Sequence, residues 1–206
     1  MLEEEKKYRE EGFSLIVGVD EAGRGPLAGP VCAAACVLPI DFFSDDINDS
    51  KQLTEKKREA LFPLIKDKAL AYGIAYASAD EIDELNIYEA TKVAMRRAIG
   101  QINVHYDLIL TDAMPLKGFQ VPLVPIIKGD AKAINIAAAS ILAKVSRDHY
   151  MLELDKKYPE YGFGKHKGYG TKAHLEALDK YGPIEGVHRK SFSPVSKFYR
   201  SQLHLF

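Results

Sequence analysis

The sequence lacks several features that define large classes of protein. It has only two cysteines in 206 residues, Cys32 and Cys36, and both lie in the apolar run 31–38. We expect them to be small core residues rather than a disulfide or a zinc pair. No apolar run approaches the roughly 18 residues that span a bilayer, and the acidic start 1–5 is unlike a signal peptide. We therefore expect a cytoplasmic protein without a membrane segment.

Two common nucleotide-binding motifs are also missing. The sequence contains no phosphate-binding loop motif. A dinucleotide fingerprint needs G-x-G-x-x-G at the start of a helix, but here the third glycine falls at Gly29, and Pro26 and Pro30 are incompatible with a helix. We expect residues 23–25 to form a loop whose bare backbone approaches a ligand closely, with Arg24 donating to a phosphate or an acid.

A large excess of charge of one sign is missing as well, but the charge is unevenly placed. The net charge is −1, whereas residues 144–200 contain twelve Lys and Arg against seven Asp and Glu. A basic face is what a nucleic-acid surface requires. Within this region, glycines and basic residues surround Tyr169, whose ring could stack on a sugar or base. Taken alone, the same loop is more simply a surface turn.

Three histidines of this basic region, His166, His174 and His188, do not have metal-ligand spacing. We therefore assign them no zinc role.

Hydrophobic residues make up 47% of the chain, enough for a sizeable core. Short β-rich apolar runs alternate with helical patterns. Strands are expected at 14–19, 31–38, 73–78, 107–111 and 121–128. Helices are expected after the caps Thr54, Asn86 and Thr171, and along 134–145, with Pro63 kinking or breaking the first of them. We divide the chain into a charged segment 1–13, a domain 14–200 with a core of about 14–150 and a helical extension of about 151–200, and a tail 201–206.

Acidic residues follow three of the expected strands. Asp20 and Glu21 end the first, Asp112 ends the fourth, and Asp130 follows the fifth. Strand ends carry sites in twisted open sheets, and converging carboxylates repel one another unless cations lie between them. Mg²⁺ or Mn²⁺ suits oxygen ligands, and a pair of such ions supports in-line displacement at phosphorus, which predicts phosphodiester hydrolysis. Carboxylates that are merely solvated are the simpler alternative.

Asp20 and Glu21 raise a geometric difficulty. Successive residues of a regular strand point to opposite faces of the sheet. Both side chains reach one site only if the pleat ends at Asp20 and Glu21 is already turning, which Gly23 and Gly25 would favour.

Taken together, the motifs resemble the bacterial ribonuclease HII family, the type 2 ribonucleases H. The resemblance covers residues 13–199. It rests on GVDEAGRGPLAGPV at 18–31, DSKQLT at 49–54, TDA at 111–113, KGDAKAINIAAASILAKVSRD at 128–148, KGYGT at 167–171 and HRKSF at 188–192.

This resemblance implies an α/β, ribonuclease H-like fold, a mixed sheet flanked by helices with a C-terminal helical extension. It also implies endonucleolytic cleavage of the RNA strand of RNA–DNA hybrids and of ribonucleotides embedded in DNA, leaving 3′-hydroxyl and 5′-phosphate ends. The expected cofactors are two divalent ions, Mg²⁺ or Mn²⁺, of which one activates a water and the other stabilises the leaving 3′-oxygen. We expect a monomer.

The resemblance also implies roles for individual residues. The metal-binding and catalytic acids correspond to Asp20, Glu21, Asp112 and Asp130. The motif that grips the ribonucleotide and its 2′-hydroxyl corresponds to Gly23, Arg24 and Gly25, with Tyr169 beside it at the RNA–DNA junction and Lys51 near the site.

The last five residues resemble a peptide by which bacterial proteins dock on the replicative sliding clamp. They are Gln202, Leu203, His204, Leu205 and Phe206. A chain end with three apolar anchors can enter a groove on a partner, as short recognition peptides do. The alternative is that these residues fold back on the protein's own surface.

Two rivals to the type 2 interpretation differ in kind. The related type 3 enzyme shares the fold and the acids but normally has an additional N-terminal domain, whereas only about a dozen residues precede the first strand here. A hybrid-binding or clamp-tethered adaptor would need no catalysis. Intact acids on three strands argue against it, and a metal-dependent cleavage assay separates the two.

Overall fold

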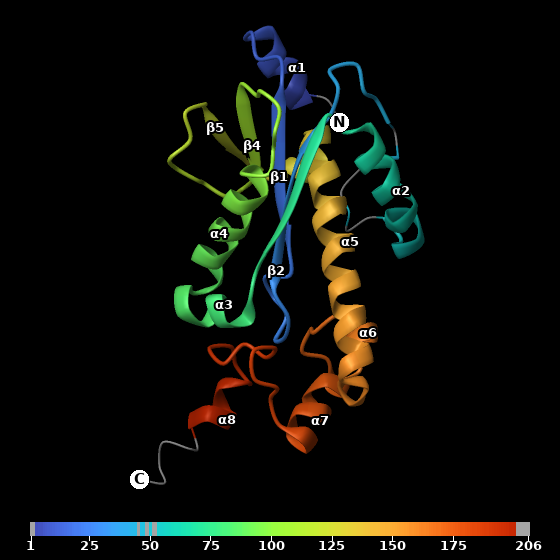
Figure 1. Ribbon diagram of the computed structural model, residues 1–206, viewed down its shortest axis with the longest axis vertical. Helices are drawn as coiled ribbons and strands as arrows, with labels where there is room; N and C mark the ends of the chain where they lie inside the picture. Colours follow the sequence, from blue (N-terminus) through green and yellow to red (C-terminus); the bar gives the residue numbers. More distant parts are fainter. Residues whose placement is uncertain (1–2, 45, 48–49, 51–52, 201–206) are drawn as a thin grey trace.

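The computed structural model describes residues 3–44, 46, 47, 50 and 53–200. A five-stranded mixed sheet forms its centre, with the strand order β3-β2-β1-β4-β5 (Figure 1). β1 pairs antiparallel with β2 and parallel with β4, while β2–β3 is antiparallel and β4–β5 is parallel. The strands are β1 (Ile16–Ala22), β2 (Val31–Val37), β3 (Ala71–Ala77), β4 (Leu108–Asp112) and β5 (Leu123–Ile126). All five expected strands are present, and the mixed sheet is confirmed.

Helices cover both faces of the sheet, with α4 on one side and α5 on the other, and a lobe of short helices lies at the foot of the molecule (Figure 1). The helices are α1 (Glu3–Glu10), α2 (Glu55–Lys68), α3 (Ala79–Leu85), α4 (Ile87–Ile99), α5 (Ile134–Lys157), α6 (Phe163–His166), α7 (Lys172–Tyr181) and α8 (Ser196–Arg200), with 3-10 turns η1 (Gly129–Ala131) and η2 (Pro159–Tyr161). Within the described ranges, none of these helices has the length and apolar character needed to cross a membrane.

Strand β2 is buried on both faces. Its alternate residues Val31, Ala33, Ala35 and Val37 pack in the cluster that includes α4, whereas Cys32, Ala34 and Cys36 pack with α5. Both cysteines are free, and burial raises the pKa of each thiol to about 12. They are therefore core residues, as the sequence predicts.

The start of α5 lies directly on β1 at Gly18. A Cβ atom at this position would lie 2.1 Å from the carbonyl carbon of Asn135 and 2.3 Å from the amide nitrogen of Ile136. Both are backbone atoms, which cannot move aside without shifting the whole helix. Glycine is thus what permits the helix to approach the strand this closely.

Helix α1 contributes to the same contact. Glu5 is fully buried, and its Oε1 accepts from the amide nitrogen of Asn135 at 3.0 Å, at the first turn of α5. Burial raises the pKa of Glu5. The Oδ1 of Asn135 in turn accepts from the amide nitrogen of Leu38, just beyond β2, at 2.7 Å. Glu5 of α1 therefore caps the helix that packs on β1.

Three details of the helices differ from or add to the expectations. Helix α2 begins at its predicted cap Thr54 but continues through Pro63, so the expected break is wrong. Helix α3 was not predicted, although Ser78 and Glu81 form a capping box at its start. Helix α5 extends to Lys157, across the boundary expected near residue 150, so the division into core and extension stays a prediction.

Replacing Gly18 with alanine tests the contact between β1 and α5. Gly18→Ala forces the added methyl group into the backbone of the first turn of α5, so the free energy of unfolding is expected to fall by about 2 kcal/mol or more. Urea denaturation measures this change. A suitable control is Gly100→Ala, because Gly100 has right-handed helical φ and ψ angles that alanine adopts. We expect the control to change stability by less than about 0.5 kcal/mol, and an equally mild effect at Gly18 would contradict the packing described.

Candidate active site

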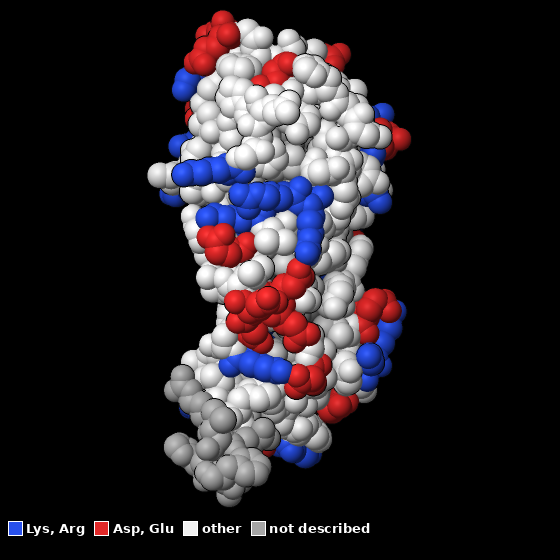
Figure 2. Space-filling view, turned by 60° about the vertical axis from the view of Figure 1, so that its left-hand side comes forward, with Lys and Arg blue, Asp and Glu red and all other residues white. Residues whose placement is uncertain are grey.

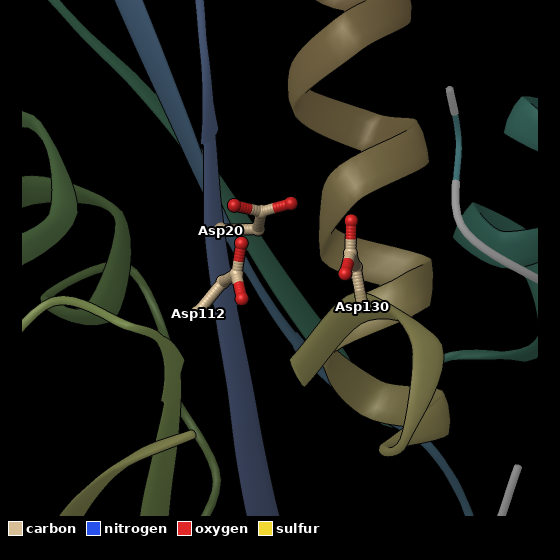
Figure 3. Close-up of side chains that lie close together, drawn as sticks. All are labelled: Asp20, Asp112 and Asp130. Atoms are coloured by element: carbon tan, nitrogen blue, oxygen red, sulfur yellow. The ribbon is translucent and has the colours of Figure 1, made fainter. Parts of the chain in front are cut away.

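Three carboxylates from separate segments converge at one end of the sheet (Figure 3). Asp20 comes from β1, Asp112 from the end of β4, and Asp130 from η1, just before α5. One oxygen of each lies within 4.8 Å of the others. The sequence placed Asp130 at the end of a strand, but β5 stops at Ile126 and a 3-10 turn carries the carboxylate.

A backbone hydrogen bond connects Asp112 to the turn that carries Asp130. The Oδ1 of Asp112 accepts from the amide nitrogen of Gly129 at 2.8 Å. Two non-glycine residues beside these acids have left-handed backbone angles, Ala113 with φ 53° and Lys128 with φ 56°. Such conformations are costly and cluster at functional sites. The backbone is therefore shaped to bring these two acids together.

Asp20 is the acid with the strongest electrostatic constraint. Its side chain is buried, and its Oδ1 accepts from the amide nitrogen of Glu21 at 2.7 Å. Burial raises the pKa of Asp20 well above its usual value, and the negative charges of Glu21 and Asp112 raise it further. A cation at this position would relieve all three effects.

Glu21 does not leave the strand as we expected. The β1–β2 ladder continues through Glu21, opposite Ala33, to Ala22, opposite Cys32. Because the alternation persists, Glu21 starts from the face of the sheet opposite to Asp20, and the expected early end of the pleat is wrong. Its Oε1 lies 3.4 Å from Nη1 of Arg24. Glu21 is not among the three clustered carboxylates, yet it lines the same cavity as Asp20.

Asp20 and Asp112 line a cavity of about 240 Å³. Its lining joins predicted site residues to others that the sequence had not singled out. The predicted ones are Asp20, Glu21, Gly23, Arg24, Gly25, Asp112 and Tyr169, and the additional ones are Ala22, Ser50, Ser140, Lys144 and Arg147. Ser140, Lys144 and Arg147 lie on α5. Arg147 belongs to the KVSRD segment that carried the family resemblance, but nothing in its spacing indicated contact with the site.

Buried Arg147 supports the loop that begins at Gly23. A Cβ atom on Gly23, where φ is +94°, would lie 1.9 Å from Nε of Arg147. The guanidinium donates to the carbonyl oxygens of Pro30, Lys167 and Ala28 at 3.0, 3.0 and 3.1 Å. Arg147 thus joins the loop after β1 to the C-terminal lobe.

A second buried arginine, Arg189, holds the same loop from the other side. It donates to the carbonyl oxygens of Gly23, Arg24 and Gly29 at 2.6, 2.8 and 3.0 Å. Burial, with the nearby charge of Arg147, lowers the pKa of Arg189 to about 9. In a trans peptide the N–H points away from the preceding carbonyl. The amides of Arg24 and Gly25 therefore point away from Arg189, and among the described residues neither has a hydrogen-bond acceptor.

Tyr169 lies beside this loop. A Cβ atom on Gly25 would be 3.6 Å from Cε1 of the tyrosine ring. Tyr169 is 45% exposed although it lines the cavity. The structure therefore brings the predicted loop 23–25 and Tyr169 together at one edge of the acid cluster.

The remaining predicted contacts, Lys51, Gln202, Leu203, Leu205 and Phe206, lie outside the described residues. Ser50, the neighbour of Lys51, is buried in the cavity wall, where its hydroxyl lies 2.7 Å from that of Ser140.

Charge on one face of the molecule is divided into bands. Figure 2 shows basic side chains across the middle of this face and acidic side chains gathered directly below them. A face with both signs close together does not offer the continuous basic track that a nucleic-acid backbone requires.

Comparison with known proteins is consistent with this geometry. Residues 17–195 match the family model described as ribonuclease HII. The chain is 55% identical to the ribonuclease HII of Desulfitobacterium hafniense over 197 residues, which cover 96% of this chain and 75% of the relative. It superposes on the ribonuclease H2 of Pyrococcus horikoshii with a TM-score of 0.77 and 27% identity, covering 91% of this chain and 98% of that one.

A further similar fold is that of the ribonuclease HII in the PCNA complex from Archaeoglobus fulgidus. The TM-score is 0.70 and the identity 24%, over 86% of this chain and 95% of that one. The match to the family model extends from β1 to the C-terminal lobe, so the three clustered acids lie within its range. The chain therefore belongs to the ribonuclease HII family, whose members are metal-dependent endonucleases.

Proposed function

We propose that this enzyme hydrolyses the RNA strand of RNA–DNA hybrids, and the phosphodiester at single ribonucleotides in duplex DNA, at Asp20, Glu21, Asp112 and Asp130. The products have 3′-hydroxyl and 5′-phosphate ends. The observation that carries this proposal is the approach of three carboxylates to within 4.8 Å of one another. Two of them, Asp20 and Asp112, line a cavity that residues 23–25 and Tyr169 also line.

The acids fit hard divalent cations. The donor set consists of carboxylate oxygens, which suit Mg²⁺ and Mn²⁺. Asp20 is buried beside other acids and has a raised pKa, as expected for a group that needs a cation to remain charged. We propose that Asp20, Asp112 and Asp130 hold two such ions together with Glu21, which reaches the cavity from the opposite face of β1. When bound, these ions would supply activation of the attacking water and stabilisation of the leaving 3′-oxygen.

The loop 23–25 and Tyr169 would select ribose over deoxyribose. The amides of Arg24 and Gly25, directed away from Arg189, are fixed donors for a 2′-hydroxyl. Gly25 leaves space beside the Tyr169 ring, against which a sugar can lie. Arg24 is held toward Glu21 and adds a charge for the phosphate. Lys51 stays a predicted substrate contact.

The C-terminal residues 202–206 would dock on the bacterial sliding clamp. This proposal rests on the sequence Gln-Leu-His-Leu-Phe. The Archaeoglobus fulgidus enzyme has been solved in complex with PCNA, the clamp of that organism. In this chain, the anchors would be Leu203, Leu205 and Phe206, with Gln202 at the start of the peptide.

We place the enzyme in the cytoplasm as a monomer. Its two cysteines are free and buried, which suits a reducing compartment, and its substrates are nucleic acids.

Asp112→Asn tests the catalytic assignment. Asparagine keeps the shape of aspartate and can still accept from Gly129, but it removes one negative charge from the cluster. Cleavage of a duplex with one ribonucleotide is expected to fall at least about 100-fold, while binding measured by fluorescence anisotropy persists. The matched control is Asp67→Asn, an exposed carboxylate on α2. Undiminished turnover by Asp112→Asn would refute the assignment.

Asp20→Asn tests the electrostatic cost of the site in metal-free protein. The pKa of Asp20 is higher in the folded than in the unfolded chain, so its ionisation destabilises the fold, and the destabilisation disappears as the pH falls through the raised pKa. The variant should therefore be more stable than wild type by about 1 kcal/mol near pH 8 and show a smaller gain near pH 5. Thermal unfolding at the two pH values measures this, and Asp67→Asn should show no such trend. An equal gain in stability for Asp20→Asn at pH 5 and at pH 8 would contradict the raised pKa of Asp20.

Removal of the last five residues tests the clamp proposal. A chain ending at Ser201 should bind purified bacterial sliding clamp at least about tenfold more weakly and cleave a short duplex at the wild-type rate. His204→Ala, at the variable position of the peptide, is the control and should bind normally in surface plasmon resonance. Equal binding by the truncated and full chains would exclude this docking mode.

A further inference from the structure

Three histidines that are distant in the sequence meet inside the C-terminal lobe. The rings of His166 and His174 stack with centroids 4.5 Å apart, and Nε2 of His174 lies 3.1 Å from Nε2 of His188. His174 and His188 are fully buried or nearly so, and the ring of Phe163 packs against both. The lobe therefore contains a core built around imidazoles.

The backbone partners of His188 and His174 fix where each ring carries its proton. Nδ1 of His188 faces the amide nitrogen of Ile184 at 2.8 Å. An amide can only donate, so this ring nitrogen has no proton and a neutral His188 carries its proton on Nε2. That proton is donated to Nε2 of His174. The proton of His174 must then be on Nδ1, which lies 2.9 Å from the carbonyl oxygen of Tyr169.

The three hydrogen bonds that join Ile184, His188, His174 and Tyr169 form a series in which every bond points in the same direction. It runs from the amide of Ile184 through His188 and His174 to the carbonyl of Tyr169. His166 is satisfied separately: its Nδ1 accepts from the amide of Gly168 at 3.2 Å, and its Nε2 donates to the carbonyl of Tyr161 at 2.8 Å. All ring nitrogens of the three neutral histidines therefore have partners.

This series of hydrogen bonds ends at the main chain of Tyr169, whose side chain lines the cavity. The Tyr169 carbonyl oxygen accepts a second bond, from the amide nitrogen of Thr171 at 2.8 Å. The amide nitrogen of Tyr169 donates to the main-chain carbonyl oxygen of His166 at 2.9 Å. The residue after His188 is Arg189, which holds the carbonyls of Gly23 and Arg24. One short segment, 188–189, is thus connected to both parts of the proposed ribose-reading surface.

We propose that His174 and His188 are positioning residues for Tyr169: their one-directional hydrogen-bond chain fixes the Tyr169 main chain so that its ring lies against Gly25. This proposal rests on the proposed role of Tyr169 in substrate reading. Neither histidine reaches the cavity, so both act through Tyr169 rather than by contact with substrate.

The series of hydrogen bonds through His188 and His174 persists only while both histidines are neutral. A proton added to His174 would place one N–H against another at the 3.1 Å contact with His188. Burial lowers the pKa of His174 and lowers that of His188 to about 4, each helped by the neighbouring histidines. The titratable or charged groups packed around the pair are His166 of α6, Tyr161 of η2 and Arg189, which adjoins His188 in the chain. At neutral pH the chain is therefore intact.

Two substitutions of His174 separate positioning from packing. His174→Phe fills the space but removes both hydrogen bonds. His174→Asn retains an amide donor where Nδ1 stood and so keeps the bond to Tyr169. We expect kcat/KM on a single-ribonucleotide duplex to fall about tenfold with phenylalanine and less than about threefold with asparagine. Phe163→Leu, which weakens the same core without touching the hydrogen bonds, should lower the melting temperature and leave kcat/KM unchanged well below it.

A double-variant comparison tests whether His174 acts through Tyr169. In a Tyr169→Ala background, His174→Phe should change kcat/KM less than about twofold. Nitrogen-15 spectra of the histidine rings should also show the Nε2–H form for His188 and the Nδ1–H form for His174 at neutral pH. The opposite forms, equal loss with phenylalanine and asparagine, or an undiminished loss in the Tyr169→Ala background would overturn the proposal.

The results expected if Tyr169 does not read the substrate differ from those expected if only the positioning proposal is wrong. If Tyr169→Ala alone cleaved at the wild-type rate, the proposed substrate reading would be wrong, and the histidine chain would then be only a part of the fold. If Tyr169→Ala were impaired while folded His174→Phe was not, Tyr169 would keep its role and only the positioning proposal would fall.

Discussion

The contact between β1 and the first turn of α5 at Gly18 is the constraint on which the site depends. Gly18 and Asp20 lie on the same face of β1, because side chains alternate along a strand. The helix that presses on Gly18 is preceded directly by the turn that carries Asp130. Glu5 stabilises that first turn by accepting a hydrogen bond from the amide nitrogen of Asn135. A methyl group added at Gly18 would push α5 away from β1, and it would therefore move Asp130 away from Asp20.

The second requirement is a rigid loop at residues 23–25 whose backbone amides face outward. Arg147 and Arg189 meet this requirement by burying two guanidinium groups whose described hydrogen bonds go to carbonyl oxygens. Burial of a charge without a carboxylate partner is unfavourable, and the lowered pKa of Arg189 reflects that cost. The buried arginines hold the carbonyl oxygens of the loop, and the backbone amides of Arg24 and Gly25 are thereby directed outward. Like the crowded acids around Asp20, this arrangement trades stability for function.

Much of the fold and the acidic site could be predicted from local patterns. Strands with continuous apolar runs, caps such as Thr54 and Thr171, and acids placed after strands are local signals, and the structure has each of them. The burial of Glu5 could not be predicted, because it depends on a partner far along the chain. The regular pleat through Glu21 was missed because glycines after a strand do not specify where its ladder ends.

The positions of buried arginines and histidines were equally beyond local patterns. Arg189 and His188 belong to a motif that pointed to the family, but their partners lie on the loop after β1 and on α7. Spacing gave no reason to assign a metal to the histidines, and it also gave no reason to expect that they touch. Such contacts are properties of the tertiary structure.

The central claim is that Asp20, Asp112 and Asp130 together bind divalent metal ions at the end of the sheet. Anomalous diffraction from crystals containing Mn²⁺ tests it most directly. The account predicts anomalous density between these carboxylates, with oxygens from all three as ligands. Manganese bound elsewhere, with the three carboxylates left without an ion at saturating concentration, would contradict it.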